Sequence, residues 1–286
     1  MIKLNSKSNG KNFDYRPYID GLRAIAVTLV LMYHAFPTLL PGGFIGVDIF
    51  FVISGYLISR IIFTSLTEDK FSVLNFYSRR ILRIFPTLIV VIFTISIIGW
   101  FALIPEENTL LGKHTAAASL FFSNILLWNE SGYFDIDSKN KPLLHLWSLS
   151  IEMQFYAIAP ALFILFYKFK RQILLNIGLL IIFSFGLNLF LIQSNPVANF
   201  YFPITRMFEL LAGSMLAYYK CEDLKTVINY NNTELIQKNY LSLLGLMLII
   251  ISVFWITPKD HFPGYVVIAP VIGAVLLIYS GPFERC

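Results

Sequence analysis

The sequence reads Ile19-Asp20-Gly21-Leu22-Arg23-Ala24-Ile25-Ala26-Val27-Thr28-Leu29-Val30-Leu31-Met32-Tyr33-His34 close to its amino-terminal end. This stretch predicts a membrane helix with two ionisable side chains, Arg23 and His34, eleven positions apart. At ~100° and ~1.5 Å per residue, the two side chains share one helix face and lie roughly 16 Å apart along the axis. Ionisable groups inside a bilayer are costly and usually serve a function. The alternative is an interfacial Arg23 whose charge reaches water and a His34 that a neighbouring helix satisfies.

The composition is typical of a polytopic membrane protein. Of the 286 residues, 57% are hydrophobic and 14% are charged, whereas a soluble domain carries nearer ~25% charged residues. Apolar runs of about 20 residues are long enough to cross a bilayer as helices. We therefore predict an all-α membrane bundle with a cytoplasmic tail over 1–17, one membrane domain over 18–280 and a C-terminal end over 281–286. The eight expected spans cover 18–40, 44–63, 84–104, 144–167, 173–192, 204–219, 240–256 and 265–279.

The distribution of Lys and Arg predicts the orientation. Segment 110–128 is apolar but contains Lys113 and His114, so it is doubtful as a span. If it is re-entrant or interfacial, 17 of the 22 Lys and Arg lie on the side of the amino terminus, and the other side holds only Lys113, Lys139, Lys141, Arg206 and Lys259. Because positively charged loops stay in the cytoplasm, this bias predicts a multi-pass cell-membrane protein with a cytoplasmic amino terminus. Orientation thus explains the basic balance, and we expect no nucleic-acid partner.

The histidines and cysteines predict no metal site. The four histidines and two cysteines match no ligand spacing, and the sequence contains no HExxH or CxxC motif. We therefore expect neither a metal ion nor a bound cofactor.

Three arginines precede the expected third span, at Arg79, Arg80 and Arg83. On a helix, Arg79 and Arg83 share a face and Arg80 lies beside them. Just inside the membrane they could hold the phosphates of a cytosolic cofactor, because Arg binds phosphate through two parallel hydrogen bonds. The alternative is an ordinary basic cluster that contacts anionic lipid.

Glu152 lies about two turns into the expected span 144–167, roughly 12 Å deep. A carboxylate inside the membrane needs a partner. His34 falls in the same outer half of the bilayer, so a pair between Glu152 and His34 is geometrically possible. The alternative is a structural pair of Glu152 with Arg206 or Arg23.

Arg206 and Glu209 are spaced i, i+3 and could pair along one helix, which is the interpretation that we favour. Ser54 and Ser148 are interpreted as helix-packing hydroxyls, because neither lies in a nucleophile elbow. The alternative role for part of this polar set is contact with the substrate, for which the candidates are Asp48, Ser148, Arg206 and Glu209.

Five blocks of sequence together resemble the membrane acyltransferase family 3, of the O-antigen acetylase type. No single block is decisive, but the set occurs in the order of the family and extends over residues ~18–215. The blocks are Ile19–Val27 with His34, Phe44–Ile58, Arg79–Pro86, His145–Tyr156 and Arg206–Gly213.

The resemblance implies O-acyl transfer, usually of acetyl, from cytosolic acyl-coenzyme A to a sugar hydroxyl. The acceptor would be a cell-surface glycan, such as the O-antigen of lipopolysaccharide, an exopolysaccharide or peptidoglycan. The matching positions imply a catalytic His34 with Arg23 as its partner, and a further site carboxylate at Glu152. The arginines Arg79, Arg80 and Arg83 would contact coenzyme A, with acetyl-coenzyme A acting as the donor substrate.

One feature departs from the family pattern. Family members generally have about ten spans, whereas this sequence ends after the eighth expected span, so we expect a bundle that lacks its last spans. Two other functions stay open: a proton-coupled transporter with His34, Glu152 and Arg206 as a relay, and an inactive truncated remnant. Inverted repeats would favour the transporter, and the sequence displays none.

Overall fold

The structure is a computed structural model that describes residues 17–130, 141–168, 172–223, 232–258 and 260–281. Throughout these ranges the regular elements are helices and no strand occurs, which confirms the all-α class. The predicted tail over 1–17 lies outside the described residues except for Pro17, as does the predicted end over 281–286 except for Gly281. The elements are α1 (Pro17–Ala35), η1 (Gly43–Ile45), α2 (Gly46–Thr67), α3 (Val73–Ala102), α4 (Pro105–Ser119), α5 (Ser123–Glu130), α6 (Leu146–Lys168), α7 (Ile173–Ser194), α8 (Pro196–Tyr201), α9 (Pro203–Asp223), α10 (Asn232–Trp255) and α11 (Ile268–Ser280).

Five helical segments of the described chain are long and apolar enough to cross a membrane. They are Gly43–Thr67, Val73–Ala102, Leu146–Lys168, Ile173–Ser194 and Ile236–Trp255. Helix α11 has 13 residues, and at ~1.5 Å per residue it reaches only about 20 Å of the ~30 Å hydrocarbon core. A helical membrane bundle is therefore confirmed, whereas the predicted count of eight spans stays a prediction.

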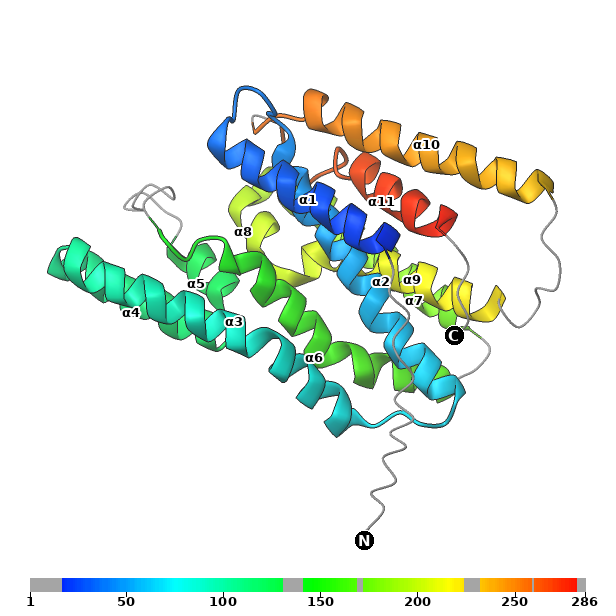
Figure 1. Ribbon diagram of the computed structural model, residues 1–286, viewed down its shortest axis with the longest axis horizontal. Coiled ribbons are helices and arrows are strands. Elements are labelled where there is room, and N and C mark those ends of the chain that lie inside the picture. Colours follow the sequence, from blue (N-terminus) through cyan, green and yellow to red (C-terminus); the bar gives the residue numbers. More distant parts are fainter. Residues whose placement is uncertain (1–16, 131–140, 169–171, 224–231, 259, 282–286) are drawn as a thin grey trace, which may run out of the picture.

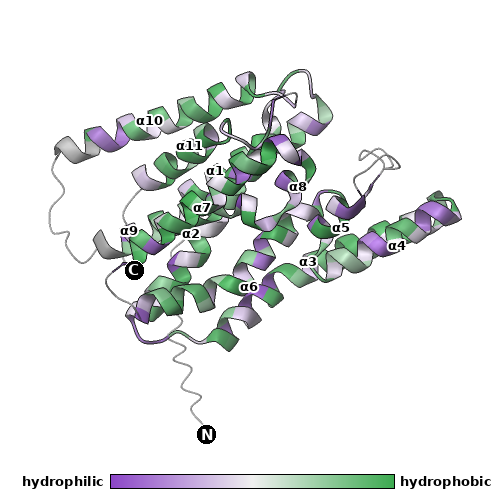
Figure 2. Ribbon diagram, turned by 180° about the vertical axis from the view of Figure 1, so that it is seen from behind, coloured by the Kyte–Doolittle hydropathy of each residue, from purple (hydrophilic) through white to green (hydrophobic). Residues whose placement is uncertain are grey.

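Helix α2 is the central element of the bundle. It packs against α1, α6, α9 and α11, and most of its residues are buried. Helices α3 and α4 run side by side at one edge of the molecule, and α10 and α11 pack together at the opposite edge (Figure 1). Hydrophobic residues predominate along α3 and α10, whereas α4 is more hydrophilic (Figure 2). Helix α2 therefore lies at the centre of the bundle, and its buried polar side chains can contact those of several neighbouring helices.

Helices α2 and α9 cross with very little space between their backbones. A Cβ atom at Gly55 would overlap the backbone of Leu210, and one at Gly213 would overlap the backbone of Val52. Small residues at such a crossing let the two helix backbones approach closely. The Ser59 hydroxyl also donates a hydrogen bond of 2.7 Å to the Ser214 hydroxyl across the same interface.

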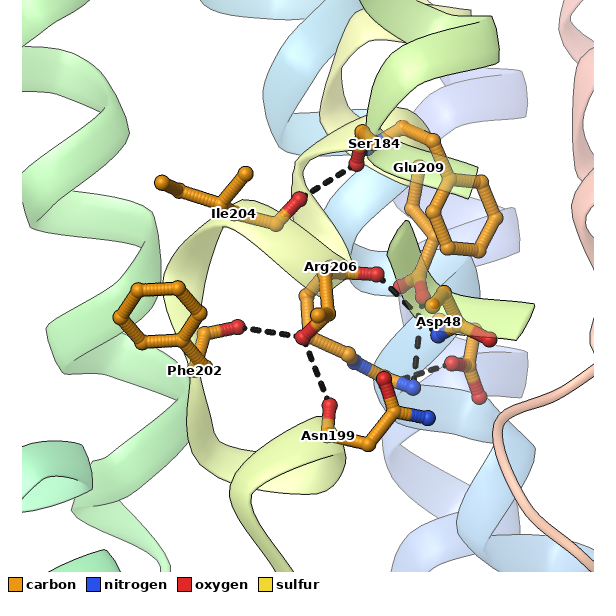
Figure 3. Close-up of polar contacts among 10 residues, drawn as sticks. Asp48, Ser184, Asn199, Phe202, Ile204, Arg206 and Glu209 are labelled. Carbon is orange, nitrogen blue, oxygen red and sulfur yellow. Dashed lines mark hydrogen bonds and ion pairs between the residues drawn. The ribbon is translucent and has the colours of Figure 1, made fainter. Parts of the chain in front are cut away.

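An ionic group lies in the interior of the same α2–α9 interface. Arg206 of α9 contacts Asp48 of α2 at 2.6 Å and Glu209 at 3.3 Å, and the three side chains are only 0–1% exposed (Figure 3). Buried charges are tolerated when they are paired. The expected Arg206–Glu209 pair is therefore confirmed, with Asp48 as an additional partner that sequence spacing did not indicate.

Aromatic rings enclose the Arg206 guanidinium. Its central carbon lies 5.5–5.9 Å from the ring centroids of four residues. The faces of aromatic rings attract cations, and the attraction strengthens when water is excluded. These rings join α2, α6, α8 and the turn before α11 around a single charge, and they belong to Phe51, Trp147, Phe200 and Phe262.

The doubtful segment 110–128 forms parts of two short helices. Helix α4 has 15 residues and α5 has 8, and between them Phe121 has a φ of 57°. Helix α4 packs along α3 and α5 packs along α6. This broken geometry agrees better with a re-entrant or interfacial segment than with one continuous span.

A largely buried polar cluster connects this region to the rest of the bundle. Glu130 accepts from Lys141 at 3.0 Å and lies 3.1 Å from His114. It joins α4 and α5 to the chain just before α6.

We expect Gly55→Ala and Gly213→Ala to destabilise the bundle, because each added methyl group would force α2 and α9 apart. Overpacking of this kind costs about 1–3 kcal/mol. Thermal unfolding of the purified protein in detergent, followed by tryptophan fluorescence, should show a lower melting temperature for both variants.

The matched controls are Gly178→Ala and Gly186→Ala, where a Cβ atom would meet nothing within 4 Å. Their melting temperatures should stay unchanged or rise slightly, because Ala favours a helix more than Gly does. Equal melting temperatures in all four variants would contradict the close crossing.

We expect Asp48→Ala to destabilise the protein strongly, because Arg206 would lose its shorter ion pair in a dry interior. Removing one partner of a buried pair costs about 3–5 kcal/mol. The measurement is the fraction of monodisperse protein that survives detergent extraction and heating before size-exclusion chromatography.

The control for this variant is Asp20→Ala, which removes the 3.7 Å contact with Arg23, where the side chains are 50% and 32% exposed. Exposed pairs contribute about 0–1 kcal/mol. If Asp48→Ala is as stable as Asp20→Ala, the buried group does not hold α2 and α9 together.

Candidate active site

Two hydroxyl groups hold the carboxylate of Glu152. Ser54 of α2 donates to Glu152 Oε1 at 2.6 Å, and the hydroxyl of Tyr156, one turn further along α6, donates to the same oxygen. Glu152 lies six residues beyond the first residue of α6, which places it about 9 Å along the helix. A carboxylate that accepts such hydrogen bonds is both stabilised and oriented.

Arg80 of α3 lies over the ring of Tyr156, the residue that donates to this carboxylate. Its guanidinium carbon is 5.9 Å from the centroid of the Tyr156 ring, and its charged neighbours are Arg83, Glu152 and Arg23. The Tyr77 hydroxyl donates a 2.7 Å hydrogen bond to the carbonyl oxygen of Ala157 and thereby ties α3 to α6. Positive side chains of α1 and α3 therefore lie in the neighbourhood of Tyr156 and Glu152 of α6.

The three predicted phosphate-binding arginines differ in their surroundings. Arg80 is half-buried, whereas Arg79 and Arg83 are exposed. All three lie within α3, which begins at Val73, about three turns before the expected start of the third span. The helix begins early because the side chain of Ser72 caps it, accepting a hydrogen bond from the Asn75 N–H.

His34 lies in the last turn of α1, at the end opposite Arg23. Its Nδ1 atom is 2.8 Å from the carbonyl oxygen of Val30. Because a carbonyl oxygen only accepts, Nδ1 carries the proton, and Nε2 of the neutral ring keeps its lone pair. His34 is exposed, so this basic nitrogen is accessible from outside the protein core.

His145 is a site residue that the sequence analysis missed. Its ring meets that of His34 edge to face, with the centroids 4.6 Å apart and an interplanar angle of 87°. Partial burial and, next, the proximity of the second titratable ring, His34, lower the pKa of His145. The available signal was its place at the head of the block His145–Tyr156, but only the fold brings it to α1.

The structure thus separates the predicted site residues into groups. Arg23 and His34 lie on one helix, as the spacing predicted, and Arg23 also contacts Asp20 at 3.7 Å. Glu152 bonds to Ser54 and Tyr156, and not to any of its three expected partners, among the contacts within the described ranges. Ser54, which we interpreted as a packing hydroxyl, is therefore a donor to a site carboxylate.

The candidates for substrate contact lie elsewhere. Asp48, Arg206 and Glu209 form the buried ionic group of the core, and we interpret them as part of the frame that supports the site. Ser148 donates a 3.3 Å hydrogen bond to the carbonyl oxygen of His145. A direct contact of any of these four residues with a substrate stays a prediction.

The arrangement has a definite chemical capacity. An imidazole with a free Nε2 can act as a general base or as a nucleophile. Arginine side chains, such as Arg80 of α3 and Arg23 at the opposite end of α1 from His34, can hold phosphate oxygens. In the part of the chain that the structure describes, no group of three or more His, Cys, Asp or Glu side chains could hold a metal ion.

Comparison with known proteins identifies relatives along most of the chain. A protein from Haemophilus influenzae of uncharacterised function is 36% identical over 248 residues, which is 82% of this chain and 97% of that protein. The peptidoglycan O-acetyltransferase OatA of Listeria monocytogenes is 38% identical over 71% of this chain and 34% of its own length. The O-acetyltransferase OatA of Staphylococcus aureus is 36% identical, with the same coverage of both chains.

The chain therefore spans about a third of the length of the OatA relatives that it matches. No solved structure matches it significantly. The profile of the family described as "Acyltransferase domain" matches residues 16–284, nearly the whole sequence. This chain belongs to that membrane acyltransferase family.

Proposed function

We propose that this chain is a membrane O-acetyltransferase that moves an acetyl group from acetyl-coenzyme A to a hydroxyl group of a cell-surface glycan. The observation that carries the proposal is the state of His34, whose Nδ1 is bonded to the Val30 carbonyl oxygen and whose Nε2 has no hydrogen-bond partner among the described residues. Because the chain belongs to an acyltransferase family, acyl transfer is the reaction that we assign to this nitrogen. The Listeria and Staphylococcus relatives are named as O-acetyltransferases, which supports acetyl as the transferred group.

The donor side of the reaction is assigned to the arginines. Arg80, with Arg79 and Arg83 beside it on α3, would hold the phosphates of coenzyme A, since guanidinium groups bind phosphate through paired hydrogen bonds. Arg23 adds a fourth positive charge in the neighbourhood of Arg80. With a cytoplasmic amino terminus, these groups face the compartment in which acyl-coenzyme A is available.

The chemistry at His34 follows one of two routes. In the first, Nε2 attacks the thioester carbon, the C–S bond breaks, and the departing thiolate takes the Nδ1 proton, which leaves free coenzyme A and a neutral acyl-imidazole. The sugar hydroxyl then attacks the acyl-imidazole and passes its proton to the ring nitrogen. In the second, Nε2 removes the hydroxyl proton as the sugar oxygen attacks the thioester directly, and the departing thiolate receives that proton.

The acceptor side lies at the His34 end of α1. The ring of His145, just before α6, contacts the His34 ring there. The name of the Listeria relative supports peptidoglycan as the acceptor. Other exported glycans present the same hydroxyl chemistry.

We expect His34→Ala to abolish acetyl transfer without disturbing membrane insertion, because it removes the general base or nucleophile. The loss should be about 10²–10⁴-fold, the usual contribution of such a group. The measurement is the acetate that mild alkali releases from the surface glycan of cells that express the chain in a strain without other O-acetylation.

The control is His261→Ala, which changes an exposed histidine in the turn after α10. It should retain the acetate release of the unaltered chain. Full O-acetylation with His34→Ala, at equal amounts of protein in the membrane, would refute the proposed role.

A further inference from the structure

We propose that Tyr156 is a positioning residue that couples the donor-binding arginine to the site carboxylate. Its hydroxyl donates to Glu152 Oε1, while its ring lies 5.9 Å from the guanidinium carbon of Arg80. Tyr156 is buried. One rigid side chain of α6 thus contacts both the charge on α3 and the charge on its own helix. This inference rests on the proposed function, because it assigns Arg80 to coenzyme A.

The hydroxyl half of the contact orients the carboxylate. Ser54 and Tyr156 both donate to Oε1 of Glu152. Within the described residues, the hydrogen bonds of this carboxylate therefore converge on one oxygen, and Oε2 stays available as an acceptor. Donors from two different helices fix the plane of the carboxylate more firmly than one would, which is how catalytic groups are held in a productive geometry.

The ring half of the contact holds Arg80. A guanidinium group that lies over an aromatic face interacts through its own face, so its N–H donors at the edge remain free for phosphate oxygens. Arg80 is half-buried, and its side chain would otherwise have considerable conformational freedom. The ring limits that freedom before the donor binds, and it does so without occupying a hydrogen-bond donor.

The two halves can be separated by two substitutions at one position. Tyr156→Phe removes the hydroxyl and keeps the ring, whereas Tyr156→Leu removes both. We expect Tyr156→Phe to lower kcat about tenfold or more, the effect of losing one hydrogen bond to a charged group. The KM for acetyl-coenzyme A should change less than about twofold, because the contact of Arg80 with the ring persists.

Tyr156→Leu should lower kcat to the same extent and also raise the KM and the Kd for acetyl-coenzyme A. The increase should be about threefold to thirtyfold, the range that a cation–π contact provides. Ser54→Ala provides a second test, since it removes the other donor to Oε1 and should lower kcat without changing KM.

The experiment measures acetyl transfer by the full chain in proteoliposomes with acetyl-coenzyme A and a glycan acceptor, together with acetyl-coenzyme A binding by calorimetry. Tyr240→Phe, at an exposed tyrosine of α10, controls for the change from Tyr to Phe. His34→Ala shows whether the observed acetyl transfer requires His34, as the proposed function states.

The outcomes separate the two proposals. If the unaltered chain transfers acetyl and His34→Ala does not, a Tyr156→Phe variant with unaltered kcat overturns the inference while the proposed function stands. Transfer that persists in His34→Ala contradicts the proposed function instead. Equal affinity of Tyr156→Leu and the unaltered chain for acetyl-coenzyme A overturns the inference whether or not transfer is observed.

Discussion

The packing of α2 against α9 depends on the deeply buried guanidinium of Arg206. It is held by Asp48 from α2 and Glu209 from its own helix, with almost no exposure of any of the three side chains. Uncompensated, such a charge in a dry interior would cost several kcal/mol. The pairing therefore fixes which face of α2 meets α9. The absence of a side chain at Gly55 and Gly213 then lets the two backbones approach.

The site follows from how this frame orients α2. Asp48 and Ser54 are six residues apart on α2, which places them about 9 Å apart along the helix and on faces that differ by roughly 120°. The helix that pairs with Arg206 on one face therefore presents a hydroxyl group to Glu152 on another. On α6, Tyr156 contacts both Glu152 and Arg80. Arg80 is therefore connected through Tyr156 and Glu152 to Ser54 of the central helix. His34, in contrast, lies at the exposed end of α1.

Local sequence features were sufficient for the helical class and for the relation between Arg23 and His34, because both depend on hydropathy and on the period of a single helix. The Arg206–Glu209 pair was predictable for the same reason. The pairing of Asp48 with Arg206 joins residues 158 positions apart, and Ser54 reaches Glu152 over 98. Such contacts arise from the packing of different helices against one another. Residue spacing within a single sequence does not predict that packing.

The boundaries and the number of spans were less predictable. Hydropathy located the third span from its apolar part, but the Ser72 cap starts α3 earlier and carries the arginines into the helix. Helix α11 was expected to be a span, yet its 13 residues are few for that role. His145 contacts His34 because the fold brings the start of α6 next to the end of α1. The residues around His145 in the sequence do not indicate this contact.

The most direct measurement uses inside-out membrane vesicles from cells that express the chain. Acetyl-coenzyme A, labelled in its acetyl group, is supplied only to the outer face of these vesicles, which is the cytoplasmic face of the membrane. We predict that label accumulates as an alkali-labile ester on glycan inside the vesicles, and that His34→Gln prevents this. Vesicles that leave the glycan unlabelled, although intact cells with the same chain O-acetylate it, would show that acetyl-coenzyme A is not the donor and would contradict the roles assigned to Arg80 and His34.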